Sequence, residues 1–348
     1  MKKETVLSGI RPTGFVHLGN YFGAIRNWVR MQDEFDCYYC VVDWHSLTTH
    51  PDTKELRHNT LRLLSVLLAS GLDPERCVLY IQSQVHEIAE LYLYLNMLSY
   101  KGELEKTVTF KDKVRQQPDN VNTGLLTYPV LQAADILIHR ALKVPVGKDQ
   151  EQHVEMTRNF AERFNYRYGE VFPLPKAFSF GGDLIKIMSL DGTGKMSKSE
   201  NQMATLYLAD DDDLIRKKIA KAKSDTVPTA PNSVKPDAVE NLFVLMRLVS
   251  SKDVVEKFET DFNNCSIRYG DMKKQLGEDM VNFIAPLREK ANAILADEKY
   301  LKGVMETGAD KAGKSAKATM KLVQEAMGLK YFLFIFRAGR SIVIIQYF

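Results

Sequence analysis

Two short runs in the chain carry residues suited to binding a polyphosphate. The run Gly194-Lys-Met-Ser-Lys-Ser199 places Lys195 and Lys198 three residues apart in a Gly- and Ser-rich turn. Lysines in such a turn suit phosphate groups better than a hydrophobic core, although a charged turn is also common on a solvated surface. The run Pro12-Thr-Gly-Phe-Val-His-Leu-Gly-Asn20 adds His17 and Asn20 near the N-terminus. Together the two runs predict a nucleotide site.

The N-terminal run lies where a strand gives way to a helix. A short strand is predicted at 4–9 and a loop at 10–16, after which Leu18 and Phe22 open an apolar helical face. His17 and Asn20 therefore lie at a helix N-terminus, where free N–H groups and the helix dipole favour phosphate. Gly14 and Gly19 would let a nucleotide approach the main chain closely.

The order of the predicted elements indicates the fold class. Apolar, β-rich runs at 4–9, 36–42, 77–82, 143–147 and 186–190 alternate with helical patterns at 18–34, 53–69, 86–99, 129–141 and 151–168. This alternation predicts an α/β fold with a doubly wound, parallel, Rossmann-like sheet. Only helical patterns follow, at 210–223, 238–249, 253–262, 272–295 and 310–327. We therefore expect a sheet domain over 1–206, a helical domain over 207–329, and an apolar tail of unassigned role over 330–348.

The polar candidates follow the predicted strands, which is where ligands of parallel sheets bind. They comprise His17 after the first strand, Asp43 and His45 after the second, Gly147, Asp149 and Gln150 after the fourth, and Lys195 and Lys198 after the fifth. Scattered surface residues would rarely be distributed in this way.

A second group of candidates lies on one predicted helix. Pro129 suits a first helical turn, and Tyr128, Gln132 and Asp135 then recur at i, i+4 and i+7, on one face. Because its neighbours are mainly apolar, the Asp135 carboxylate needs a partner. That partner is either a bound ligand or a group of the protein itself. In the second case Asp135 would cap a helix or form a salt bridge.

Composition limits the remaining possibilities. The 348 residues are 45% hydrophobic and 26% charged, which is enough for a large core and two domains. A net charge of +3 does not by itself predict a nucleic-acid partner. The cysteines at 37, 40, 77 and 265 are too scattered for a disulfide framework, and Cys37 and Cys40 fall on opposite faces of a predicted strand. Without a visible signal peptide or membrane span, a cytoplasmic location is the expectation.

Several runs give the chain a family resemblance. His17-Leu-Gly-Asn20 and Lys195-Met-Ser-Lys-Ser199 are similar to the two signature motifs of class I aminoacyl-tRNA synthetases. Further runs at 128–136, 147–153 and 308–329 extend the likeness from about Val6 to Leu329. With these further runs in the same order, the chain resembles the tryptophanyl-tRNA synthetases, a family within that class.

The resemblance implies a two-step reaction in which ATP activates tryptophan and the product passes to tRNA(Trp). It implies Mg²⁺ accompanying ATP, a homodimer, and an anticodon-reading helical domain; no structural metal or iron–sulfur cluster is expected. The residues expected to stabilise charge on the phosphates are His17, Asn20, Lys113, Lys195 and Lys198. Those expected to bind ATP are Arg11, Thr13, Gly14, His17, Gly19, Asn20, Gly147, Asp149, Lys195, Met196, Ser197 and Lys198. Those expected to bind tryptophan are Leu7, His45, Tyr128, Gln132, Asp135, Val144, Val146 and Gln150, with Asp135 accepting the indole N–H.

Departures from the commoner family pattern occur at Leu7, Gln132 and Lys148. A tyrosyl-tRNA synthetase remains an alternative, because Gln132 with Asp135 would also suit a phenol. More distant alternatives are a nucleotidyltransferase and a non-catalytic tRNA-binding paralogue. Basic residues that would suit tRNA phosphates, or simply form solvated helix faces, are Lys217, Lys218, Lys221 and Lys223, and Lys311, Lys314, Lys317 and Lys321.

Overall fold

A computed structural model describes residues 3–50, 52–147, 150–180, 185–197 and 201–331. In these residues five parallel strands form one sheet in the order β3-β2-β1-β4-β5. The strands are β1 (Thr5–Ile10), β2 (Asp36–Val41), β3 (Val78–Ile81), β4 (Lys143–Pro145) and β5 (Lys176–Phe178). The order reverses between β1 and β4, so the predicted doubly wound α/β fold is confirmed.

Helices cover both faces of the sheet, which is why its central strands are apolar on both sides. One face packs on α4 (Leu56–Ala69), and the other on α5 (Glu87–Leu98), α8 (Thr123–Ile138) and α9 (Glu151–Tyr168). Cys37 and Cys40 of β2 belong to these two separate cores, as the strand interpretation predicted. Shorter helices in this region are α1 (Leu18–Asn20), α2 (Arg26–Met31), α3 (Asp43–Leu47), α6 (Lys101–Glu105) and α7 (Val108–Gln116).

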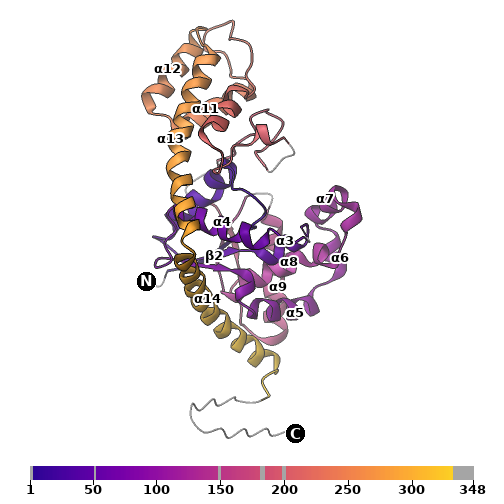
Figure 1. Cartoon of the computed structure of the whole chain (residues 1–348). Helices are drawn as coiled ribbons and strands as arrows, with labels where there is room; N and C mark the ends of the chain where they lie inside the picture. The colour runs from indigo at the N-terminus through magenta and orange to yellow at the C-terminus, as the bar shows by residue number, and fades with distance from the viewer. Residues whose placement is uncertain (1–2, 51, 148–149, 181–184, 198–200, 332–348) are drawn as a thin grey trace.

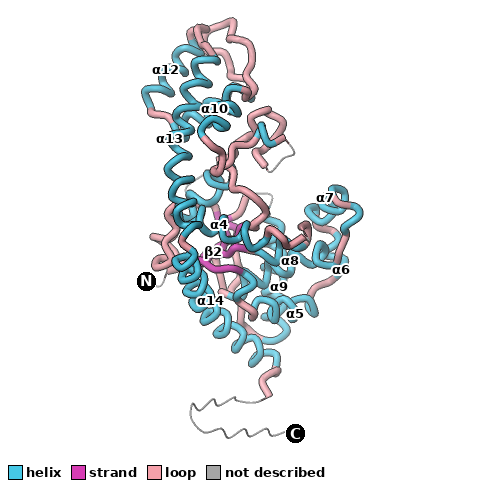
Figure 2. Tube along the Cα trace, in the orientation of Figure 1, coloured by secondary structure: helices cyan, strands magenta, loops and turns pink. Residues whose placement is uncertain are grey.

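In the described residues after 206 the regular elements are helices, as predicted. Its helices are α10 (Asp212–Ala220), α11 (Asp237–Val249), α12 (Lys252–Asn263), α13 (Tyr269–Ala296) and α14 (Glu298–Met327). Figure 1 shows α11 and α12 in a lobe at the top, from which α13 descends toward the sheet. Figure 2 shows α14 continuing past the sheet, and α14 contacts β3 and α5. The last helix therefore packs on the sheet region.

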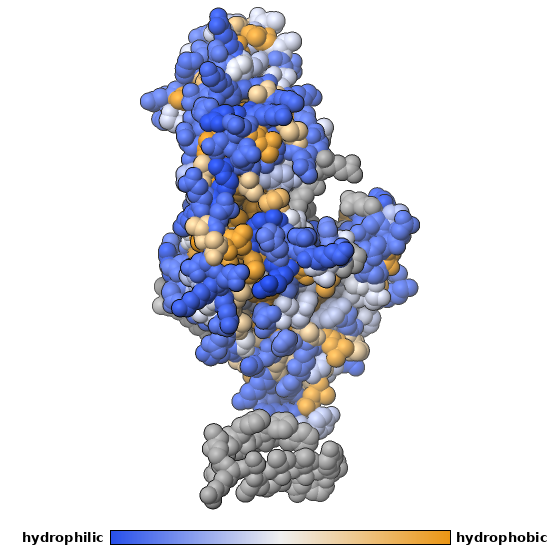
Figure 3. All heavy atoms as spheres, viewed as in Figure 1, coloured by the Kyte–Doolittle hydropathy of each residue, from blue (hydrophilic) through white to orange (hydrophobic). Residues whose placement is uncertain are grey.

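Most of the face in Figure 3 is hydrophilic, and apolar side chains gather near its middle, at about the level of α4. At that level α4 packs against α13, which continues the core of the sheet region into the helical part of the chain. No described helix has both the length and the apolar character needed to cross a membrane.

The fifth strand lies elsewhere than predicted. Residues 186–190 form no strand; Met188 makes only an isolated bridge to Lys195, while β5 is Lys176–Phe178. The apolar residues Ile187 and Leu190 are buried because their loop packs on the core, so their hydrophobicity did not indicate a sheet position. The prediction that Lys195 follows the fifth strand is therefore wrong, and Lys198 lies outside the described residues.

Two helices also differ from prediction. α8 begins at Thr123 rather than at Pro129, because the Asn122 side chain caps it by accepting a hydrogen bond from the Leu125 N–H at 2.9 Å. Pro129 thus lies inside the helix. The helix predicted at 18–34 is interrupted by a π-helical turn, Tyr21–Ile25. Neither difference moves Tyr128, Gln132 and Asp135 off their common face of α8.

Candidate active site

The turn between β1 and α1 is held by a reciprocal pair of hydrogen bonds. His17 is the N-cap of α1, and its Nδ1 accepts from the Asn20 N–H at 3.2 Å. In return, Asn20 Oδ1 accepts from the His17 N–H at 3.3 Å. Both predicted residues are therefore fixed in one capping box at a helix start, with His17 only 6% exposed.

This turn contacts the second lysine-containing run. A Cβ added at Gly19 would lie 3.3 Å from the Met196 carbonyl oxygen and 3.0 Å from His17 Nδ1. The Met196 side chain is buried in the core, whereas Lys195 and Ser197 are exposed. Met196 thus anchors the run, and its main chain faces the first motif. In their described residues the two motifs therefore lie next to each other.

The run is preceded by a tight turn built around Asp191. Asp191 Oδ1 accepts hydrogen bonds from Ser189 Oγ at 2.6 Å and Thr193 Oγ1 at 2.8 Å, and Gly192 has a φ of +72°. These hydrogen bonds, that from Ser189 foremost, lower the pKa of Asp191 to about 2. The carboxylate therefore stays ionised and holds the turn that presents Lys195.

Beside these motifs, a cavity of about 380 Å³ opens at the carboxyl ends of the strands. This volume is within the range of small-molecule sites. Every residue predicted to bind tryptophan lines it: Leu7, His45, Tyr128, Gln132, Asp135, Val144, Val146 and Gln150. Arg11, Lys113 and Gly147 line it as well. The cavity thus has apolar walls from β1 and β4 and one polar wall from α8.

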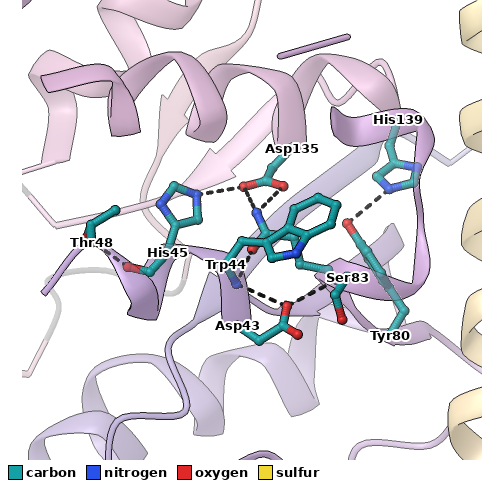
Figure 4. Close-up of polar contacts among 9 residues, drawn as sticks. Asp43, Trp44, His45, Thr48, Tyr80, Ser83, Asp135 and His139 are labelled. Atoms are coloured by element: carbon teal, nitrogen blue, oxygen red, sulfur yellow. Dashed lines mark hydrogen bonds and ion pairs between the residues drawn. The ribbon is translucent and has the colours of Figure 1, made fainter. Parts of the chain in front are cut away.

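Asp135 is the most strongly held group in this cavity (Figure 4). It is 2% exposed, and its Oδ2 lies 2.9 Å from His45 Nε2. Gln82 Nε2 donates to both carboxylate oxygens, at 2.8 and 2.9 Å. Gln82 in turn accepts from the Trp44 N–H at 3.1 Å, which fixes the orientation of its amide. The three residues form a buried polar cluster.

Gln82 is a site residue that the sequence analysis missed. It is fully buried and follows β3 directly, at the same edge of the sheet as the other candidates. It is the last residue of the predicted strand 77–82, which places it near the edge of the sheet where the other candidates lie, but nothing in the sequence links it to Asp135. Asp43, which follows β2, has a local role instead: its Oδ1 accepts from the Trp44 and Ser83 N–H groups at 3.1 and 3.0 Å.

Four other residues that line the cavity, Thr109, Tyr128, Gln150 and His153, form a second chain of polar contacts. The Tyr128 hydroxyl is 2.5 Å from Thr109 Oγ1 and 2.8 Å from His153 Nε2. His153 Nδ1 is 2.8 Å from Gln150 Oε1. Tyr128 and Gln150, both predicted site residues, are therefore joined through His153. This chain of contacts gathers several polar groups on the lining of the cavity.

Lys113 lies over the Tyr128 ring, with Nζ 3.6 Å from the ring centroid. Burial, followed by the nearby positive charge of Arg11, lowers the pKa of Lys113 to about 8. In the part of the chain that the structure describes, no carboxylate forms an ion pair with Lys113, and a lysine near another cation is destabilised until an anion binds. This electrostatic setting supports a phosphate or carboxylate ligand between Lys113 and Arg11.

The predicted residues are not all gathered in the cavity. His17, Gly19, Asn20 and Lys195 belong to the adjoining turn and loop, and Gly14, with a φ of +92°, lines a separate hollow between α4 and α13. The Thr13 N–H donates to the Arg11 carbonyl at 2.9 Å, and neither cavity contains Thr13. Lys148, Asp149 and Lys198 lie outside the described residues.

One predicted basic residue is unavailable to a polyanion. Lys218 is 2% exposed and pairs with Asp210 at 2.6 Å. The suggestion that it meets tRNA phosphates is therefore wrong, because the charge run at 217–223 spans an inward-facing position of α10. Lys217 and Lys221 remain exposed.

The strand order and a cavity lined by residues that follow β1, β2 and β4 define an α/β protein of the Rossmann type. Comparisons with known proteins narrow this class. Residues 1–285 match the family model described as tRNA synthetases class I (W and Y), and the chain belongs to that family.

Individual relatives cover nearly the whole chain. The tryptophan–tRNA ligase of Porphyromonas gingivalis is 55% identical over 94% of this chain and 100% of its own length. The tryptophan–tRNA ligase of Clostridium acetobutylicum is 41% identical over 94% and 97%. A crystal structure of tryptophanyl-tRNA synthetase from Campylobacter jejuni, complexed with ADP and tryptophan, has 33% identity and a TM-score of 0.83, covering 93% of this chain and 99% of that one.

Proposed function

We propose that the chain is a tryptophan–tRNA ligase, which activates tryptophan with ATP and transfers it to tRNA(Trp). The relatives that match it over nearly their full length bear that name. The observation that carries the substrate assignment is the buried Asp135, which His45 and Gln82 hold at the wall of the cavity.

Asp135 suits an indole N–H because of what it already accepts. A carboxylate offers about four acceptor positions, and three contacts from His45 and Gln82 occupy part of that capacity. A ligand donor would use the remainder. A ligand without a donor, such as phenylalanine, would cover the carboxylate and deprive it of a hydrogen bond, which disfavours that ligand strongly.

In the first step, the tryptophan carboxylate oxygen attacks the α-phosphate of ATP. A new P–O bond gives tryptophanyl-adenylate, and the bond to the departing pyrophosphate breaks. His17, Asn20, Lys113, Lys195 and Lys198 would stabilise the charge on the phosphates, so catalysis rests on positioning and electrostatics. In the second step, a ribose hydroxyl of the terminal adenosine of tRNA takes the tryptophanyl group and releases AMP.

The binding roles that we propose are those that the family resemblance implies. Arg11, Thr13, Gly14, Gly19 and the 195–198 run would contact ATP, with Met196 contributing through its main chain. Gly147 and Asp149 would hold the adenosine side. His45, Tyr128 and Gln150 would orient the ammonium and carboxylate of tryptophan, while Leu7, Gln132, Val144 and Val146 would surround its ring.

Mg²⁺ would enter with ATP and be held mostly by phosphate oxygens and water. Within the described residues, no group of three or more His, Cys, Asp or Glu side chains could hold a metal ion, so these residues do not provide a protein cage for it.

The larger organisation is proposed as follows. Residues 1–206 would form the activating domain and 207–329 the domain that reads the anticodon, although α14 also packs on β3. We propose a homodimer in the cytoplasm, and we assign no role to the apolar tail 330–348.

The test is amino-acid-dependent exchange of labelled pyrophosphate into ATP, with tryptophan, tyrosine and phenylalanine in parallel. Exchange with tryptophan alone is expected. Exchange with tyrosine alone would instead indicate a tyrosyl-tRNA synthetase, the other activity that the family description includes. If the folded protein showed no exchange with any amino acid, the enzyme assignment would be overturned.

A substitution at Asp135 tests whether the activity depends on the cavity. Asp135→Ala should lower kcat/KM for tryptophan about 100-fold or more, because a hydrogen bond to a buried charged group is lost. Asp310→Ala removes an exposed carboxylate from α14 and serves as the control, since Asp310 pairs with the exposed Lys314 of its own helix at 2.6 Å. Equal effects of the two substitutions would contradict the assignment of Asp135.

A further inference from the structure

The two nucleotide motifs are joined by a short main-chain segment, residues 205–208, which we call the linking segment. The Leu18 N–H donates to the Leu206 carbonyl at 3.0 Å, and the Leu208 N–H donates to the Val16 carbonyl at 2.9 Å. Thr205 Oγ1 donates to the Ser197 carbonyl at 2.9 Å. The segment therefore touches the residues flanking His17 on one side and the lysine-containing run on the other.

A buried ion pair holds the linking segment. Lys218 Nζ donates to the Thr205 carbonyl at 2.8 Å and to Asp210 Oδ2 at 2.6 Å. The same Asp210 oxygen accepts from the Tyr207 N–H at 2.9 Å. Lys218 and Asp210 are 2% and 7% exposed. Alternate residues of an extended segment face opposite sides, so Thr205 and Tyr207 meet the ion pair while Leu206 and Leu208 meet the first motif.

The cost of this arrangement argues that it serves more than stability. Burying two charges costs free energy that their attraction often fails to recover, and apolar replacements are often as stable. Here the hydrogen bonds of the pair go to main-chain groups of the linking segment. Neither residue lines the cavity. The pair therefore fixes the backbone geometry between two ATP-binding motifs.

We propose that Lys218 and Asp210 are positioning residues for ATP, acting through the linking segment to hold the His17 turn and the lysine-containing run at a fixed separation. This inference rests on the proposed function. It predicts a selective effect on ATP: the cavity that would hold tryptophan has its own supports, His45 and Gln82, and shares none with the linking segment.

The first test is Lys218→Met, which keeps the chain length and removes the ammonium. We expect KM for ATP in pyrophosphate exchange to rise about tenfold or more, as for loss of hydrogen bonds to a charged group. KM for tryptophan should stay within about twofold of the wild-type value. Because the buried Asp210 is left without its partner, the melting temperature is measured alongside.

Two further variants allow the proposal to be tested if Lys218→Met fails to fold. Asp210→Asn removes the charge but keeps an oxygen that can accept from the Tyr207 N–H. Thr205→Val is nearly isosteric and removes only the hydroxyl that donates to Ser197. Both should raise KM for ATP selectively, with the Thr205 effect nearer to about threefold because one neutral hydrogen bond is lost.

Arg216→Met is the matched control. Arg216 lies on the same helix as Lys218 but is exposed, and it pairs with Glu278 of α13 at 2.9 Å. It should leave both KM values unchanged. Equal changes in both KM values, or unchanged KM values in folded Lys218 and Asp210 variants, would overturn the inference. A wild-type protein without any exchange activity would instead overturn the proposed function, so the two failures are distinguishable.

Discussion

Gln82 donates to both oxygens of Asp135, at 2.8 and 2.9 Å, from a position that is fully buried. The two residues come from different elements, since Gln82 follows β3 and Asp135 lies on α8. Gln82 is itself fixed by the Trp44 N–H. The carboxylate proposed to recognise the substrate is therefore aimed by a neighbouring amide as well as by its own helix.

Gln82→Met should weaken tryptophan binding because it removes the amide and keeps the side-chain length. We expect KM for tryptophan to rise about tenfold, the effect of losing hydrogen bonds to a charged acceptor. KM for ATP should change little. Pyrophosphate exchange at varied tryptophan measures the effect. The control is Gln84→Met in the same turn, where the glutamine is exposed. An unchanged KM for tryptophan in the Gln82 variant would refute this role.

Lys113 predicts an unusual pH dependence. Its pKa is lowered from 10.5 to about 8, by burial and then by Arg11. Above about pH 8 the free protein would lose this charge, so kcat/KM for ATP should fall as pH rises through that value. Lys113→Arg keeps a positive charge at all accessible pH values. It should therefore remove this decline while retaining part of the activity.

Unfolding would not explain such a decline. Between about pH 8 and 10.5 the unfolded state binds more protons at Lys113 than the folded state does, so its contribution to stability rises with pH over this window. Lys111→Arg, on the exposed side of the same helix, should leave the profile unchanged. If the decline persists in Lys113→Arg, another group is responsible.

The parts of the site that could be predicted from sequence depend on local patterns. His17 and Asn20 were found because a strand, a Gly-containing loop and a helical face follow one another, and a helix N-terminus has a known chemistry. Tyr128, Gln132 and Asp135 were placed on one face by helical spacing alone, although the start of the helix was predicted at the wrong residue. The periodicity of apolar residues predicts which face of a helix a residue occupies more reliably than it predicts where the helix begins or ends.

The missed features depend on tertiary contacts. Gln82 carries no charge and no motif, so only the fold shows that it meets Asp135. Lys218 was expected at the surface because lysine usually is, yet Asp210 compensates its burial. The fifth strand has three residues, Lys176–Phe178, too few to show a pattern, while the more apolar segment containing Ile187 and Leu190 is a buried loop.

Gly19 provides a test of the contact between the two motifs. Gly19→Ala would place a methyl group 3.0 Å from His17 Nδ1 and 3.3 Å from the Met196 carbonyl oxygen, so one of these groups must shift. We expect KM for ATP to rise about tenfold, with KM for tryptophan nearly unchanged. Gly23→Ala is the control, because its added methyl group would lie 3.9 Å from the Ile185 carbonyl oxygen, an ordinary van der Waals contact. An equally large effect of both substitutions would argue against a specific contact.

Gly308 allows α14 to pack closely on β3, and a substitution there tests this packing. A Cβ at this position would lie 1.9 Å from the Leu79 carbonyl oxygen of β3, a main-chain atom that cannot rotate away. Gly308→Ala should therefore displace the helix and lower the free energy of unfolding by about 3 kcal/mol. Gly303 lies on the same helix, and a Cβ there would meet no described atom within 4 Å beyond its chain neighbours and the adjacent helix backbone. Gly303→Ala should therefore stabilise the protein by about 0.5–1 kcal/mol through helix propensity. Denaturant titration of both variants measures this contrast, and similar stabilities would show that α14 is not closely packed on β3.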